Sequence, residues 1–196
     1  MRRLPVYFLI DTSRSMTGAK ITAVNEGLAA IVAGLRTDPH ALEVAHMSII
    51  TFSTEAKQVL PLTNILEITQ LSRINAIGWT NIEAGLNKLL ECMDKEILTN
   101  DIRLERKGDY KPVVIIFSDG GQSRGDYHNI LEQVHARFAK CQSVTAFVAT
   151  GGKYRSYFEE MKEIVGPHGQ VIDLNDFDSS TFIRVIEIVS QSVQQA

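Results

Sequence analysis

Cysteine, proline and tryptophan, residues whose abundance marks specialised protein classes, are rare in this sequence. Its 196 residues include only two cysteines, five prolines and one tryptophan. Cys92 and Cys141 lack metal-ligand spacing, and so few cysteines exclude a disulfide framework in a chain of this length. Because no repeat, low-complexity tract or Pro/Gly-rich linker divides the chain, we expect a single domain over residues 1–196, with reduced cysteines.

Long apolar runs and an excess of one charge are also missing. The longest apolar runs, residues 6–10 and 112–117, are far shorter than the roughly 20 residues that span a bilayer. Arg2 and Arg3 precede the first run as in a signal peptide, but no small-residue cleavage site follows. The net charge of −3 provides no overall attraction to nucleic acid or to an acidic membrane. We therefore expect a cytoplasmic protein that binds neither.

Continuous apolar segments, typical of strands, alternate with segments in which apolar residues recur at helical spacing. Strands are expected at residues 4–10, 44–52, 57–62, 113–117, 144–149 and 170–174. Helices are expected at residues 21–35, 82–97, 130–138, 158–165 and 182–193. This alternation predicts an α/β fold, in which a mostly parallel central sheet carries helices on both faces.

Single residues refine this prediction. Pro61 cannot donate to a strand ladder, so its strand is expected at a sheet edge, and the short link before it makes it antiparallel to the preceding strand. Pro39 is expected to end the first helix, and Asp178, Ser179 or Ser180 to cap the last one.

Oxygen-bearing side chains follow two apolar strands and precede a helix. Asp11, Ser13 and Ser15 alternate directly after the first strand, Asp119 follows the strand at 113–117, and Thr80 comes just before a helix. The carboxyl ends of parallel strands meet at one edge of a sheet, where open α/β folds bind their ligands. Carboxylates and hydroxyls without histidine or cysteine suit Mg²⁺, Mn²⁺ or Ca²⁺ rather than zinc.

This combination resembles the metal-ion-dependent adhesion site (MIDAS) of von Willebrand factor A (VWA) domains. The three parts are Asp-x-Ser-x-Ser, a Gly-x-Thr that opens a helix, and an apolar strand that ends in Asp-Gly. The resemblance implies a Rossmann-like three-layer fold with sheet order 3-2-1-4-5-6 and one antiparallel edge strand. The first eleven residues and Asp38-Pro39-His40-Ala41 further resemble the TerY group, bacterial VWA proteins linked to tellurium resistance and stress.

The same resemblance implies which residues hold a metal. They are Asp11, Ser13, Ser15, Thr80 and Asp119. A coordination position left to water would accept an Asp or Glu carboxylate from a protein partner. Arg14, Trp79 and Arg124 are candidates for the rim that meets this partner.

Simpler roles exist for several of these residues. Asp11 and Asp119 are typical turn residues after strands. Thr80 and Glu83 fit a capping box, in which the threonine caps the helix. Arg14 and Arg124 can be solvated surface charges, and Trp79 a partly buried loop residue.

The function predicted is a non-enzymatic, metal-dependent interaction module of a tellurite-resistance, stress or phage-defence system. Its partner would supply the Asp or Glu, and a kinase or phosphatase of the same operon is a candidate. The alternative is a Mg²⁺-dependent phosphoryl hydrolase of the haloacid dehalogenase type, which also places an Asp after its first strand. Such enzymes usually carry a second Asp two residues on, where this chain has Ser13.

Overall fold

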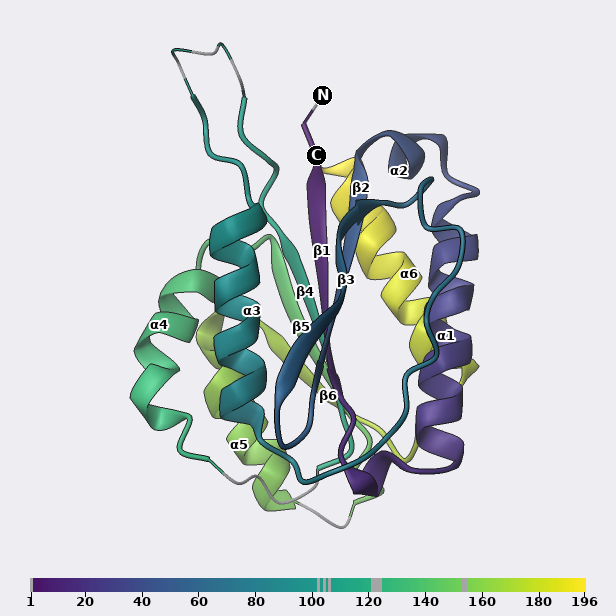
Figure 1. The fold of residues 1–196 in the computed structure, drawn as a ribbon, viewed down its shortest axis with the longest axis vertical. Coiled ribbons are helices and arrows are strands. Elements are labelled where there is room, and N and C mark those ends of the chain that lie inside the picture. The colour runs from purple at the N-terminus through teal and green to yellow at the C-terminus, as the bar shows by residue number, and fades with distance from the viewer. Residues whose placement is uncertain (1, 102, 104, 106, 121–124, 153–154) are drawn as a thin grey trace.

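One six-stranded sheet forms the centre of the computed structural model, which describes residues 2–101, 103, 105, 107–120, 125–152 and 155–196 (Figure 1). The strands are β1 (Leu4–Asp11), β2 (Ala45–Phe52), β3 (Ala56–Asn64), β4 (Val113–Ser118), β5 (Ser143–Val148) and β6 (Gln170–Asp173). Their order is β3-β2-β1-β4-β5-β6, and all neighbours are parallel except β2 and β3. This confirms the predicted sheet, including the antiparallel edge strand that contains Pro61.

Helices cover both faces of the sheet, as predicted. They are α1 (Ala19–Leu35), α2 (Pro39–Val44), α3 (Ile82–Glu96), α4 (His128–Phe138), α5 (Arg155–Val165) and α6 (Ser179–Gln194). Figure 1 shows α1 and α6 on one face, and α3, α4 and α5 on the other. None of the described helices is both long and apolar enough to cross a membrane.

The central strand β1 is buried along all eight residues. Phe8 and Ile10 pack into the core beneath α1 and α6, while Tyr7 and Leu9 pack into the core beneath α3, α4 and α5. This alternation follows from the two-residue period of a strand with a helical layer on each face. Because β2 lies on one side of β1 and β4 on the other, the strand order reverses here, and the loops after β1 and β4 meet at this switch point.

The chain between α1 and β2 differs from the prediction. Helix α1 already ends at Leu35, and Pro39 begins the short helix α2 instead of ending α1. The Asp38 carboxylate caps α2 by accepting a hydrogen bond from the His40 amide. Proline is favoured in the first turn of a helix because its missing N–H needs no partner there. The last helix matches the prediction, with Asp178 as its N-cap.

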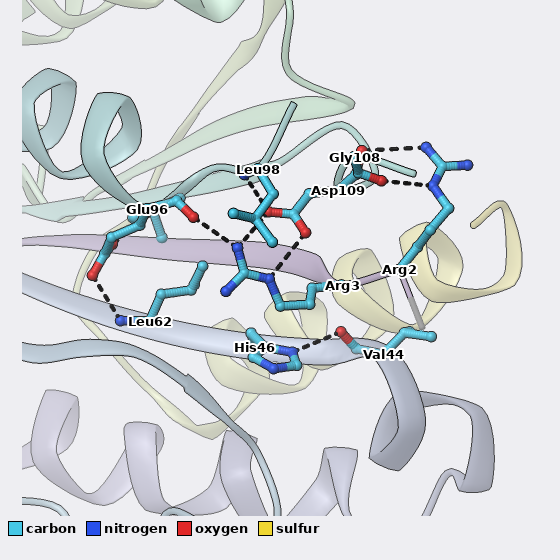
Figure 2. A network of polar contacts seen from close by, with 10 residues as sticks. Arg2, Arg3, Val44, His46, Leu62, Glu96, Leu98, Gly108 and Asp109 are labelled. Atoms are coloured by element: carbon cyan, nitrogen blue, oxygen red, sulfur yellow. Dashed lines mark hydrogen bonds and ion pairs between the residues drawn. The ribbon is translucent and has the colours of Figure 1, made fainter. Parts of the chain in front are cut away.

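A polar network closes the amino end of β1 (Figure 2). Arg3 donates to both carboxylate oxygens of Asp109, at 2.9 and 2.7 Å, and to the Glu96 carbonyl at 2.7 Å. Asp109 also accepts from the Leu98 amide, and its own amide donates to the Leu98 carbonyl. The network therefore joins the two ends of the segment between α3 and β4, at Leu98 and Asp109.

We predict that Arg3→Met lowers the free energy of unfolding by about 2 kcal/mol, because it leaves the Asp109 carboxylate, only 2% exposed, without its cation. Urea unfolding measures this change. Lys95→Met is the control, since its ion pair with Glu91 lies on the exposed surface of α3 and should matter little. Equal losses in the two variants would contradict the prediction.

Candidate metal centre

The two aspartates predicted as ligands lie side by side at the carboxyl ends of β1 and β4. Asp11 is the last residue of β1, and Asp119 directly follows β4, which pairs in parallel with β1. Both residues are buried, with exposed fractions of 0% and 2%. The Ser118 hydroxyl donates to Asp11 Oδ2 at 2.7 Å. The strand pairing thus places two carboxylates in one buried polar site.

The loop after β1 turns its hydroxyls toward this site. Asp11 Oδ1 accepts a hydrogen bond from the Ser13 amide at 2.8 Å, so the turn role that the sequence suggests for Asp11 is present. Ser15 Oγ donates to Asp119 Oδ1 at 2.8 Å, and the Ser13 and Ser15 hydroxyls are 3.0 Å apart. The Ser15 proton points to Asp119, and the Ser13 hydroxyl lies within hydrogen-bond distance of Ser15. Three of the predicted ligands therefore form one continuous chain of oxygens.

The long connection between β3 and α3 is tied to this loop by backbone hydrogen bonds of the residues just before Thr80. The Ile77 amide donates to the Thr12 carbonyl at 2.7 Å, and the Arg14 amide donates to the Gly78 carbonyl at 3.0 Å. Thr80 itself is buried, with 4% of its surface exposed. These backbone bonds tie the segment just before Thr80 to the loop that carries Ser13 and Ser15.

Side chains at α1 and its C-cap form hydrogen bonds to the backbone of the same connection nearer its start, at residues 65–74. The Asn25 side chain accepts from the Ile74 amide and donates to the Ile74 carbonyl, as a strand partner would. Arg36 donates to the carbonyls of Ile65 and Ile68, at 3.0 and 2.6 Å. Side chains of α1 and of its C-cap residue thus replace the backbone partners that an irregular segment lacks.

The capping role suggested for Thr80 is wrong. Asn81 is the N-cap of α3, and its side chain accepts from the Ala84 amide at 3.1 Å. Glu83 accepts from the Asp126 amide instead of closing a capping box. Asn is among the strongest N-cap residues, and it stands one position closer to the helix than Thr80.

Two side chains of the site were missed by the sequence analysis. Lys20, in the first turn of α1, pairs with Asp119 Oδ2 at 2.6 Å. The Tyr157 hydroxyl of α5 lies 2.8 Å from Ser118 Oγ, and it is the donor because Ser118 gives its own proton to Asp11. Tyr157, Met161 and Ile164 follow one another at helical spacing, so the sequence pattern indicates only that Tyr157 is a core residue.

Burial is the main electrostatic feature of the site. It raises the pKa of Asp11 to about 6, although hydrogen bonds from Ser118 and Ser13 lower it in part. Burial also raises the pKa of Tyr157 well above its ordinary value, so this hydroxyl stays protonated. A positive charge near Asp11 would offset the cost of keeping its carboxylate ionised.

The rim of the site is exposed. Arg14 is exposed, and Trp79 keeps 58% of its surface in solvent instead of lying partly buried in its loop. Ile77, two residues before Trp79, is 72% exposed. Arg124, the third predicted rim residue, lies outside the described residues.

The oxygens fit a hard divalent cation. Ligands at neighbouring corners of an octahedron of radius about 2.1 Å lie about 3.0 Å apart. The oxygen separations along Ser13, Ser15 and Asp119, 3.0 and 2.8 Å, are hydrogen-bond distances that are also compatible with this spacing. The described residues contain no cluster of three His, Cys, Asp or Glu side chains, so a metal site here depends on hydroxyls.

Comparisons with known proteins agree with the fold and the motif. The family model of the von Willebrand factor type A domain matches residues 6–187. The search of curated proteins gave no match.

Three solved structures illustrate the structural similarity. The PilB minor pilin of Streptococcus sanguinis has 13% identity and a TM-score of 0.65, over 98% of this chain and 62% of the pilin chain. A von Willebrand factor type A protein of Catenulispora acidiphila has 13% identity and a TM-score of 0.60, over 98% and 43%. Proximal thread matrix protein 1 of the mussel byssus, with a zinc-occupied MIDAS motif, has 20% identity and a TM-score of 0.62, over 96% and 46%. The chain thus spans less than two thirds of each, and the likeness shows the fold.

We predict that Gly78→Ala destabilises the protein by about 2 kcal/mol. Its φ is +86°, and a Cβ there would stand 2.6 Å from Thr54 Oγ1. Gly152→Ala is the control, because its φ is also positive (+75°) but no described neighbour lies within 4 Å of the new Cβ. Urea unfolding compares the two variants. An equal or larger loss in Gly152→Ala would show that the close approach at Gly78 carries no cost.

Proposed function

The chain belongs to the von Willebrand factor type A family, and on that premise we propose that it is a metal-dependent protein-interaction module. The observation that carries this proposal is the chain of oxygens from Ser13 through Ser15 to Asp119, beside the buried carboxylate of Asp11. A site with two carboxylates and three hydroxyls provides less negative charge than an all-carboxylate site. It suits a cation that is shared with another molecule.

Ser13, Ser15, Thr80, Asp11 and Asp119 would hold the cation. Mg²⁺, Mn²⁺ or Ca²⁺ fits these oxygen donors. The zinc in the MIDAS of the mussel protein supports a divalent metal at this position of the fold. When bound, the cation supplies a positive charge that neutral hydroxyls only partly offset, and a partner's Asp or Glu would complete its coordination.

The residues of this chain prepare the site for such a partner. The Ser118 and Ser13 hydrogen bonds orient the Asp11 carboxylate, and Tyr157 in turn orients Ser118. Arg14 and Trp79 at the exposed rim would contact the partner around its carboxylate. Arginine and tryptophan are enriched among the residues that dominate binding at interfaces.

We further propose the cellular setting that the TerY resemblance implies. The chain would act in the cytoplasm, in a tellurite-resistance, stress or phage-defence system, with a kinase or phosphatase of the same operon as a candidate partner. Support comes from the first eleven residues and the segment 38–41, which resemble the TerY group. The free thiols of Cys92 and Cys141 fit a reducing compartment.

The proposal is of a binding module and not of an enzyme. A phosphoryl hydrolase of the haloacid dehalogenase type uses a second aspartate where this chain has Ser13. The Ser13 hydroxyl lies 3.0 Å from Ser15 Oγ in the oxygen chain, and a neutral hydroxyl suits a metal ligand better than it suits the acid–base role of a carboxylate.

We predict that Ser13→Ala and Asp119→Ala each weaken Mn²⁺ binding by at least about tenfold, because the first removes a hydroxyl donor and the second a carboxylate with its negative charge. Mn²⁺ binding to metal-free protein is measured by quenching of Trp79, the single tryptophan, which lies next to Thr80. Ser143→Ala is the matched control, since this buried hydroxyl at the start of β5 has no hydrogen-bond partner among the described residues.

The partner is tested separately, by pull-down from the host in Mg²⁺ or in EDTA. Proteins retained only by metal-loaded wild type, and lost with Ser13→Ala, support the interaction module. Capture that persists in EDTA would reject it. Hydrolysis of phosphate esters that requires Mg²⁺ and Asp11 would instead favour the enzyme.

A further inference from the structure

Lys20 places a positive charge inside the oxygen site. Its ammonium lies 2.6 Å from Asp119 Oδ2, while the other oxygen of that carboxylate accepts from Ser15. The Asp119 side chain is 2% exposed and that of Lys20 30%. Both oxygens of Asp119 therefore have partners on this chain, one a neutral hydroxyl and the other a cation.

The position of Lys20 is set by the fold. It stands in the first turn of α1, whose N-cap is Gly18 with a φ of +87°. The chain turns sharply at this glycine, directly after the short helix Arg14–Met16, so that the start of α1 returns to the site. Helix α1 also packs against the sheet through Val24 and Leu28, which fixes its direction.

The formal charges show what this lysine does. Asp11 and Asp119 alone would give the site a charge of −2, and Lys20 reduces this to −1. A divalent cation would then leave the loaded site at +1, whereas without Lys20 the loaded site would be neutral. Since charges at close range in a partly buried site interact strongly, this difference acts on the cation and on an incoming anion in opposite directions.

We propose that Lys20 is a tuning residue of the site, which weakens metal binding and strengthens the binding of a partner carboxylate to the loaded site. The inference rests on the proposed metal-dependent function. Lys20 repels the divalent cation, and the same charge attracts the partner's Asp or Glu. With Lys20 present, the metal-loaded site has a formal charge of +1. The partner's carboxylate, rather than another carboxylate of this chain, would then bring that charge to zero.

Lys20→Met and Lys20→Arg test this inference on the full chain. Methionine keeps the length and the apolar stem of the side chain, while arginine keeps its charge. Lys88→Met is the matched control, because Lys88 pairs with Glu91 on α3 and does not contact the site. Mn²⁺ is titrated into each metal-free protein, and N-acetyl-aspartate methylamide into each Mn²⁺-loaded protein, with Trp79 fluorescence as the readout.

We expect Lys20→Met to bind Mn²⁺ about tenfold more tightly and the aspartate probe about tenfold more weakly than wild type. Lys20→Arg and Lys88→Met should stay within about twofold of wild type for both ligands. These opposite changes distinguish a charge effect from a structural one, since a disturbed site would bind both ligands more weakly.

Three results would overturn the inference. Unchanged Mn²⁺ affinity in Lys20→Met rejects the repulsion, and weaker Mn²⁺ binding shows that Lys20 instead holds Asp119 in place. Equal or tighter binding of the probe by Lys20→Met rejects the attraction. In all three cases the proposed function would still stand if wild type binds Mn²⁺ and Ser13→Ala weakens that binding. If wild type does not bind Mn²⁺, both the proposed function and this inference are rejected.

Discussion

The site depends on two buried carboxylates that the sheet brings together. Asp11 and Asp119 are separated by more than a hundred residues, yet Asp11 ends β1 and Asp119 directly follows the neighbouring parallel strand β4, and both are buried. Burial opposes their ionisation, as the raised pKa of Asp11 indicates. The surrounding hydroxyls and one lysine reduce this cost but contribute only a single positive charge.

The rest of the molecule supplies the groups that stabilise this pair of charges. Helix α1 contributes Lys20 directly, and its residue Asn25 and its C-cap residue Arg36 hold the connection that leads to Thr80. Helix α5 contributes Tyr157 from the other face of the sheet. Both helical layers therefore reach the site, which explains how a loop of short side chains keeps a defined arrangement.

The sequence predicted the strands, their order and the oxygen-bearing residues, because each of these depends on local periodicity or on a recognisable motif. The α1–β2 connection was mispredicted because Pro39 was interpreted as a helix stop, although Asp38 before it is an N-cap. The simpler alternative for Thr80, a cap of α3, was wrong for a similar reason, since Asn81 is also a good cap and stands next to the helix. In each case the local sequence is compatible with two positions for a helix boundary.

Lys20 and Tyr157 could not be predicted in the same way. The partners of these residues, Asp119 and Ser118, are 99 and 39 positions away, so their contacts exist only once the strands are ordered. A lysine in the first turn of a helix is usually solvated, and a tyrosine at apolar spacing is usually part of the core. Sequence pattern reports which face a side chain occupies, but a polar contact between two elements also needs their relative position.

The buried carboxylates at the two ends of the sheet have different partners. At the amino end, Arg3 pairs with both oxygens of Asp109 through a fixed, two-pronged contact that neutralises the carboxylate fully. At the carboxyl end, Asp119 has one flexible lysine and one hydroxyl, and Asp11 has only hydrogen-bond donors that carry no charge. A cation at the amino end would have to displace a guanidinium, whereas at the carboxyl end it would meet carboxylate charge that the protein leaves uncompensated. The same fold thus neutralises a buried carboxylate at one end of its central strand and leaves carboxylate charge only partly compensated at the other.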